Sequence, residues 1–304
     1  GSPHLFNEFD LEKIGDGVEL GITAEQAKQQ FADTEKAYGG KAAYEKAKEA
    51  GRTKLNYHQW VQVRTPAFKA WFGDSKVVDD QGKPLVVYHG TASDISVFDI
   101  SRSGESTNNT GFYGQGAYFT EDIEDATGYA AWAERGEGGR NLIPAYLSIR
   151  NPVYVHVNPK TEADKSRSRQ SLQVLLDQLE KNGVFGTYPD PNEAGSLFGK
   201  LTKLLANAEF EKFMGALYNS QGGGQAVTEL AQKVGFDGVA VYSFKRDRNM
   251  LIEAVAFRDT QIKSAIGNNG SFDGTNPDIT YQRDLHGSPH LFNEFDLEKI
   301  GDGV

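Results

Sequence analysis

Short β-forming runs separated by long polar segments most strongly limit what this chain can fold into. Runs with the lengths of strands lie at 86–91, 143–149, 238–242, 251–257 and 261–265. The segments between them are mostly helical in pattern, and they do not follow a regular strand–helix–strand alternation. This arrangement predicts an α+β fold with a largely antiparallel sheet.

Helix signals divide the chain further. Thr23 with Gln26 three residues later forms a capping box before an Ala- and Lys-rich stretch, and a second helix is expected at 41–50. Thr65-Pro66 starts another helix, which ends at Gly73 and carries Phe68, Trp71 and Phe72. Three polar helical segments, near 168–182, 197–219 and 225–234, indicate an insertion. We expect a helical N-terminal arm at 1–56 and a main domain at 57–285 with an insertion at 158–225.

An internal repeat marks both ends of the sequence. Residues 1–18 recur without change as 287–304. A fainter similarity links His286-Gly287-Ser288, followed by Phe295, to His89-Gly90-Thr91, followed by Phe98 at the same interval. We therefore interpret 286–304 as a truncated repeat, although a flexible scar explains it equally well.

Composition excludes several classes of function. The 304 residues include no cysteine, so disulfides, thiolate metal sites and a cysteine nucleophile are ruled out. No apolar run approaches the roughly 20 residues that span a bilayer. The formal net charge of −10 disfavours broad binding to nucleic acid, although Lys245, Arg246 and Arg248 form a local basic cluster. Six histidines without HExxH-like spacing make a dedicated metal site unexpected.

The run Val86–Thr91 is the first candidate for a functional site. It reads as a short buried strand that ends in His89 and Gly90, where an imidazole can face a ligand and a glycine allows close approach to backbone. A polar, Gly-rich loop at 101–116 follows, of a length typical of disorder or of a functional lid. It leads into Ala117–Thr120, where Tyr118 by itself reads as a core residue.

Four blocks together resemble a known family. The stretches RTPAFKAWFGDSKVVDDQGKPLVVYHGT, GFYGQGAYFT, VGFDGVAVY and QIKSAIGNNGSFDGTNPDITYQ occur in this order within residues 60–283. They are similar to ADP-ribosyltransferases with a His-Tyr-Glu signature, and above all to the transferase domains of phage and mobile-element polyvalent proteins. The resemblance implies a split antiparallel β-sandwich around a cleft for NAD+. The N-terminal arm and the insertion are covered less well.

The resemblance also implies roles for single residues. His89 would bond a ribose hydroxyl on the adenosine side of NAD+, and the backbone of Gly90 would hold the nicotinamide carboxamide. Tyr118 would stack on the nicotinamide ring, with Tyr129 on its second face. Glu253 would be the catalytic carboxylate and bond the 2′-hydroxyl of the nicotinamide ribose. The remaining expected NAD+ contacts are Thr91, Phe119 and Gln261.

Glu253 and Gln261 compete for the third signature position. Glu253 lies on a β-forming run eight residues before Gln261, the interval found in poly(ADP-ribose) polymerases, whereas some related transferases use Gln. The alternation of Ile252, Val255 and Phe257 is too irregular to decide which way Glu253 faces. The chemistry favours a carboxylate, because departure of neutral nicotinamide leaves positive charge on the ribose. No metal is needed for this reaction.

The leading hypothesis is therefore a mono-ADP-ribosyltransferase that uses NAD+ as substrate and modifies a macromolecule. The acidic composition favours a protein acceptor over nucleic acid, which stays open. An NAD+ glycohydrolase and a catalytically silent binding module of a phage polyprotein are the alternatives. We expect action in the cytoplasm of a host or target cell, after delivery with a phage particle or as a toxin, and no membrane partner. The oligomeric state is left undetermined by the sequence.

Overall fold

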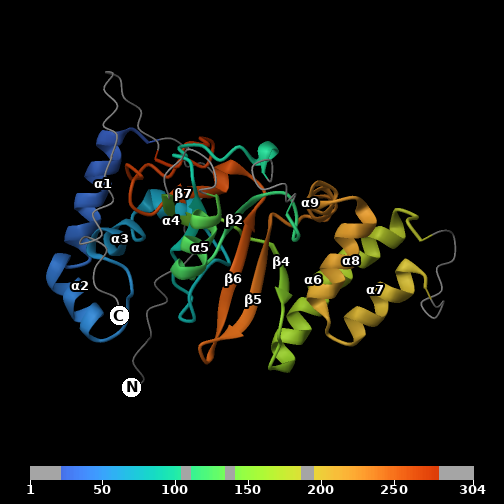
Figure 1. Ribbon diagram of the computed structural model, residues 1–304. Coiled ribbons are helices and arrows are strands. Elements are labelled where there is room, and N and C mark those ends of the chain that lie inside the picture. The colour runs from blue at the N-terminus through green and yellow to red at the C-terminus, as the bar shows by residue number, and fades with distance from the viewer. Residues whose placement is uncertain (1–21, 104–110, 134–140, 186–194, 281–304) are drawn as a thin grey trace. The chain divides into compact units, whose positions relative to one another are not determined.

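The computed structural model describes residues 22–103, 111–133, 141–185 and 195–280 (Figure 1). The chain divides into two compact units. Among the described residues, the first unit combines those up to Trp71 with 266–276 and Thr280, and the second combines those of 72–265 with 277–279. The repeated ends, 1–18 and 287–304, and part of the predicted loop at 101–116 lie outside the described residues. The domain boundaries expected at 56 and 285 stay predictions.

Helices at the N-terminal side of the chain begin where the sequence signals them. The capping box is present, with Gln26 N–H donating to Thr23 Oγ1 at 3.2 Å and Thr23 N–H to Gln26 Oε1 at 2.8 Å. The helices are α1 (Ala24–Ala37), α2 (Gly40–Glu49), α3 (Tyr57–Gln62) and α4 (Pro66–Phe72). Helix α3 was not predicted, although Asn56 and Gln59 cap it in the same way. Its Trp60 and Val61 are buried with Tyr44 of α2.

The second unit contains two sheets. The first has the order β1 (Val87–Thr91), β3 (Asn141–Leu147), β7 (Ile262–Ser264), and the second has the order β2 (Ala117–Phe119), β6 (Arg248–Ala256), β5 (Gly238–Lys245), β4 (Pro152–His156). All pairs are antiparallel except β4 with β5. The predicted α+β class with a largely antiparallel sheet is confirmed. Strand β4, which opens at Pro152, was not predicted.

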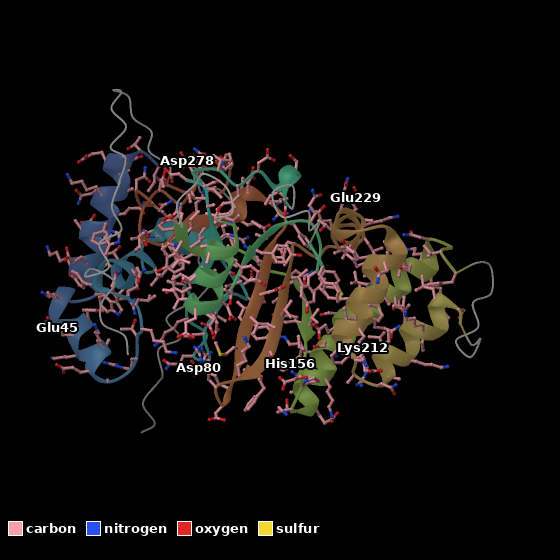
Figure 2. The ribbon with its side chains drawn as sticks, viewed as in Figure 1. Glu45, Asp80, His156, Lys212, Glu229 and Asp278 are labelled. Atoms are coloured by element: carbon pink, nitrogen blue, oxygen red, sulfur yellow. The ribbon has the colours of Figure 1, made fainter. Side chains whose placement is uncertain are left out.

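The insertion is helical, as predicted, but its boundaries differ. Helix α6 (Glu162–Lys181) begins before the expected residue 168, at a Thr161 capping box. The segment expected to be one helix at 197–219 is two, α7 (Leu197–Ala206) and α8 (Phe210–Gln221), because Ala208 takes a φ of 58°. Helix α9 (Gly224–Lys233) follows. Exposed charged residues such as Lys212 and Glu229 cover the outer surfaces of these helices (Figure 2).

The four-stranded sheet has an apolar core on each face. One, the inner core, combines Ala254 and Ala256 of β6 with side chains of the three-stranded sheet such as Val87 and Leu147. The other, the helix-side core, combines Val255 of β6 with side chains of α6, α7, α8 and α9. In Figure 1 these helices gather beside β4, while α5 (Ile123–Ala133) packs against β1. Residues on β6 can therefore face either core.

Candidate active site

His89 lies where the two sheets meet. Tyr88 N–H donates to Thr120 C=O at 2.7 Å and Thr120 N–H to Tyr88 C=O at 3.0 Å, which joins β1 to the end of β2. The His89 ring is half-buried, with Phe98 and Phe119 at centroid distances of 5.0 and 5.5 Å. Its Nδ1 lies 2.7 Å from the carbonyl oxygen of Tyr118. A carbonyl only accepts, so Nδ1 carries the proton and Nε2 is left as an acceptor in the neutral ring.

Burial also fixes the charge of His89. It lowers the pKa of the imidazole below its usual value, and the hydrogen bond to Tyr118 opposes this only in part. The ring is therefore neutral near pH 7. An unprotonated Nε2 suits it to accept a hydrogen bond from a hydroxyl group.

Gly90 is required by close packing and leaves its backbone groups available. A Cβ at this position would lie 1.9 Å from the Ala126 carbonyl oxygen, because α5 packs directly on this part of β1. The backbone N–H and C=O of Tyr88 bond to Thr120, and Tyr88 lies opposite Pro144, which has no N–H. The hydrogen bonds from β1 to β3 are therefore made by the alternate residues of β1. Gly90 therefore directs its N–H and C=O to the same edge as Tyr88, past the junction.

Tyr118 is fixed at both ends of its side chain. Its backbone is in β2, opposite Val255, and its ring packs against the helix-side core. The hydroxyl donates to Gly114 C=O at 2.7 Å and accepts from Tyr113 N–H at 3.1 Å. Since two hydrogen bonds hold the phenol in the preceding turn, the orientation of the ring is set by the turn as well as by the strand.

A β-bulge lies beside Glu253. Val241 of β5 pairs with Glu253, but the next residue, Tyr242, pairs with Leu251, so Ile252 is an extra residue in β6. Leu251 belongs to the inner core, whereas Val241, directly opposite Glu253, belongs to the helix-side core. Glu253 thus lies on the face that also carries Tyr118. The two are diagonal neighbours across β2 and β6, about 7–8 Å apart by ordinary sheet geometry.

Glu253 has an unusual electrostatic environment. Burial, followed by the negative charges of Glu211 on α8 and Asp125 on α5, raises the pKa of Glu253 from 4.5 to about 7. Burial and the charge of Glu253 together raise the pKa values of Tyr118 and of Tyr129, an exposed residue of α5. Glu253 is therefore the carboxylate around which the tyrosines of β2 and α5 gather, and a positive charge beside it would be strongly favoured.

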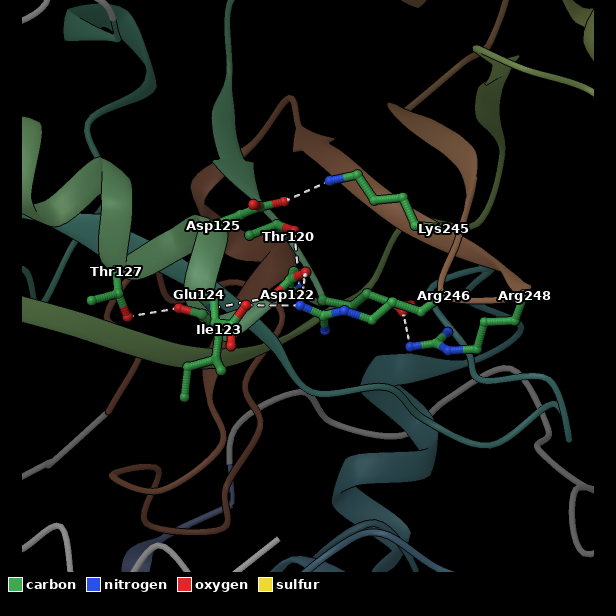
Figure 3. Close-up of polar contacts among 10 residues, drawn as sticks. Thr120, Asp122, Ile123, Glu124, Asp125, Thr127, Lys245, Arg246 and Arg248 are labelled. Carbon is green, nitrogen blue, oxygen red and sulfur yellow. Dashed lines mark hydrogen bonds and ion pairs between the residues drawn. The ribbon is translucent and has the colours of Figure 1, made fainter. Parts of the chain in front are cut away.

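The basic cluster of the sequence has a structural partner. Arg246 and Asp247 form the tip of the β5–β6 hairpin, which meets the N-terminal end of α5 (Figure 3). Its cations pair with acids there: Lys245 with Asp125 at 3.1 Å, Arg246 with Asp122 at 3.2 Å and Glu124 at 2.8 Å, and Arg248 with Glu121. These contacts hold α5 to the hairpin that carries Glu253. The three cations of the basic cluster are therefore each paired with acids and do not form an open basic groove for nucleic acid.

One predicted site residue, Gln261, has its side-chain amide bonded to backbone groups of the protein. The Gln261 amide is buried; its Nε2 donates to Ser148 C=O at 3.0 Å and to Asp237 C=O at 2.9 Å, and its Oε1 accepts from Arg258 N–H at 2.9 Å. The structure does not bring Gln261 to Glu253, because the Gln261 side chain is hydrogen-bonded to the backbone groups of Arg258, Ser148 and Asp237.

Two further residues expected to contact NAD+ also have roles in packing and local structure. Phe119 is 2% exposed and faces the inner core, where it supports the His89 ring. Thr91 Oγ1 accepts from Ser93 N–H at 3.1 Å in a local turn. Contact of either with NAD+ stays a prediction.

Sequence reasoning missed three residues of this environment. Glu211 belongs to the insertion, and its approach to Glu253 depends on how α8 folds back onto the sheet, for which no local pattern exists. Asp125 stands in the first turn of α5, where acidic residues are common, so its sequence context does not distinguish it. Tyr113 was given no role, although it stands in the GFYGQGAYFT block; burial and the charge of Glu253 raise the pKa of its phenol.

The fold and this site define an α+β protein with a half-buried carboxylate, Glu253, that lies near other negative charges. Comparison with known families matches residues 79–272 to the family described as ADP-Ribosyltransferase in polyvalent proteins. The chain belongs to this family, whose activity is ADP-ribosylation with NAD+ as substrate, and the resemblance seen in the sequence is confirmed. No curated protein and no solved structure matches the chain.

Two kinds of feature are absent from the residues that the structure describes. No helix in that part of the chain is long and apolar enough to cross a membrane. Within the same ranges, no group of three or more His, Asp or Glu side chains is placed to hold a metal ion.

Proposed function

We propose that the chain is a mono-ADP-ribosyltransferase that cleaves the nicotinamide–ribose bond of NAD+ and transfers ADP-ribose to a macromolecule, with Glu253 as its catalytic carboxylate. The single observation that carries this is Glu253, a half-buried carboxylate with a pKa raised to about 7 on the same sheet face as Tyr118. Loss of nicotinamide leaves an oxocarbenium-like ribose. A desolvated carboxylate surrounded by other negative charges stabilises that cation more than it stabilises the neutral ribose of the ground state.

The other residues would bind and orient NAD+. His89, neutral and with Nε2 free to accept, would take a hydrogen bond from a ribose hydroxyl. Gly90 presents an N–H and a C=O on one edge, a pair that complements the oxygen and the NH2 of a carboxamide. The ring of Tyr118 is held by its hydroxyl, so it would stack on nicotinamide with little loss of side-chain entropy. Tyr129 would cover the second face.

The finer features of the family enter the same proposal. The three- and four-stranded sheets would be the two halves of the split sandwich, with NAD+ at the junction between Tyr88 and Thr120. The acceptor would be a protein, since the net charge of −10 disfavours nucleic acid. Membership in a family of polyvalent proteins supports an effector delivered by a phage or another mobile element into the cytoplasm of a host cell.

Nicotinamide release from NAD+ tests the proposal, with the chain compared to Glu253→Ala and to a matched control, Glu229→Ala. Glu229 is an exposed carboxylate on α9, so the control makes the same change in net charge outside the site. We expect a loss of about 10² or more for Glu253→Ala, the scale of losing a transition-state partner, and none for Glu229→Ala. Equal release by all three proteins would refute the assignment. An ADP-ribose mass increment on acceptor protein distinguishes transfer from hydrolysis.

A further inference from the structure

The turn that holds the Tyr118 hydroxyl, residues 111–116, is itself bound to helix α9. Both backbone groups of Gln115 bond to this helix: the N–H donates to Gly224 C=O at 3.0 Å, and the C=O accepts from Thr228 Oγ1 at 2.9 Å. All of these residues belong to the second unit. The first turns of α9 therefore hold the 111–116 turn through its backbone.

The Thr228 hydroxyl does not make the hydrogen bond that is common for its place in a helix. A Ser or Thr hydroxyl inside a helix often donates to the carbonyl four residues back, which here is that of Gly224. Thr228 is buried, and it donates its one hydroxyl proton to Gln115 instead. A Cβ at Gly114, whose φ is 125°, would lie 2.7 Å from Thr228 Oγ1. The hydroxyl is therefore packed against the turn and bonded to it.

One peptide group connects α9 to the ring of Tyr118. The peptide between Gly114 and Gln115 donates its N–H to Gly224, and its C=O accepts from the Tyr118 hydroxyl at 2.7 Å. A peptide group is planar, so a rotation that weakens one of these hydrogen bonds also weakens the other. Thr228 holds the next carbonyl along the chain, and its hydroxyl thereby restrains this peptide from rotating.

We propose that Thr228 is a positioning residue for NAD+ binding: by holding the backbone at Gln115, it fixes the ring of Tyr118 on which nicotinamide stacks. This inference rests on the proposed function, in which that ring binds nicotinamide. Without the Thr228 hydroxyl, the turn and the ring gain freedom, and NAD+ binding must order them at a cost in entropy. Since the ring contacts the ligand before and during bond cleavage, the loss weakens binding of NAD+ and of the transition state alike. It should therefore raise KM and leave kcat nearly unchanged.

Steady-state nicotinamide release by the full-length chain tests the proposal. Thr228→Val keeps the shape of the side chain and removes the hydroxyl, and we expect its KM for NAD+ to be about three- to tenfold higher, with a similar kcat. Thr228→Ser keeps the hydroxyl and should have the KM of the parent chain. The matched control is Thr202→Val on α7, because Thr202 Oγ1 has no hydrogen-bond partner among the described residues. It should change neither constant.

A purely structural role of Thr228 predicts a different pattern. It would lower the amount of folded enzyme, which reduces the apparent kcat and leaves KM unchanged. That pattern in Thr228→Val would overturn the proposal. So would a KM in Thr228→Ser that is raised as much as in Thr228→Val, because the hydroxyl would then not be the group that matters.

Combining Thr228→Val with Tyr118→Phe tests whether Thr228 acts through the ring. Phenylalanine has no hydroxyl to bond to Gly114, so in this background the ring is already released from the turn. Thr228→Val should then raise KM no further, which is the non-additivity expected of two residues that act in one network. An equal rise of KM in both backgrounds would show that Thr228 does not act through Tyr118, and would overturn the proposal.

Failure of this inference can be distinguished from failure of the proposed function. An active parent chain with an unchanged KM in Thr228→Val refutes the positioning role alone. If the parent chain releases no nicotinamide, the proposed catalysis fails, and equilibrium binding of NAD+ takes the place of KM. Weaker binding by Thr228→Val, with the parent affinity in Thr228→Ser, would then support the positioning role by itself. Equal binding by the parent chain and Thr228→Val, or no binding by either, would refute it.

Discussion

Replacing Glu253 by glutamine should change the pH dependence of stability by an amount that follows from its surroundings. The pKa of Glu253 is raised from 4.5 to about 7 in the folded protein, chiefly by burial. The folded state therefore holds the proton more tightly than the unfolded state does. Each tenfold difference in proton affinity corresponds to about 1.4 kcal/mol, so ionising Glu253 above pH 7 costs the fold about 3 kcal/mol.

The sign of the effect is set by the two pKa values. Below pH 4.5 the side chain is protonated in both states and no cost arises. Between pH 4.5 and 7 the unfolded state loses its proton first, so the folded state is progressively destabilised as the pH rises. Glutamine resembles the protonated acid and avoids the cost. Glu253→Gln should therefore raise the free energy of unfolding by about 1 kcal/mol at pH 5 and by about 3 kcal/mol at pH 9.

Urea unfolding of the chain and of Glu253→Gln at several pH values between 5 and 9 measures this difference. Glu229→Gln serves as the control, and its effect should be small and nearly independent of pH because Glu229 is exposed. A gain from Glu253→Gln that is the same at pH 5 and pH 9 would show that Glu253 ionises as it does in water. The electrostatic reasoning for the site would then fail, whatever the activity of the variant.

Three further predictions concern the same site. The kcat/KM for nicotinamide release should rise with pH up to about 7 and level off above it, since the ionised form of Glu253 is the active one; a flat profile from pH 5 to 8 would contradict this. Gly90→Ala should lower the free energy of unfolding in urea by about 1–3 kcal/mol, because the added Cβ would meet the Ala126 carbonyl. The control, Gly128→Ala in the helix that contains Ala126, has open space around the added Cβ and should be neutral or stabilising by up to about 1 kcal/mol. Equal effects of the two substitutions would refute the packing argument. Tyr118→Phe removes the two hydrogen bonds of the hydroxyl and should lower the free energy of unfolding by about 1–2 kcal/mol. It should keep most of the activity measured as nicotinamide release. A loss of activity as large as that of Tyr118→Ala would show that the hydroxyl, and not the ring, matters.

Local signals allowed much of the fold to be predicted. The capping box at Thr23 and the proline at position 66 mark helix starts that depend on nearby backbone only, and both helices begin there. His89 and Glu253 were each expected on a strand, and each lies on one. Such features survive folding because the interactions that produce them span a few residues.

Features that depend on distant segments were missed. Strand β4 was not predicted: it is the edge strand of its sheet and Pro152 is its first residue, a position where the missing N–H is tolerated. The Gln261 amide is occupied by backbone groups of residues 148 and 237, which no local pattern could identify. The irregular alternation around Ile252 was seen in the sequence, but its cause, the bulge, exists only in the pairing with β5.

The bulge at Ile252 makes the spacing of residues along β6 as important as their identity. Removing Ile252 would restore simple alternation between Leu251 and Glu253 and would leave Glu253 opposite Val241, on the side of the helix-side core. Glu253 therefore takes its face from its spacing to Val255, and a one-residue insertion or deletion between these two would turn it toward the inner core. A related chain could thus lose the residue of the bulge and keep a usable carboxylate, and alignments of this family should count residues from Val255 back to the glutamate before it is taken as the catalytic one.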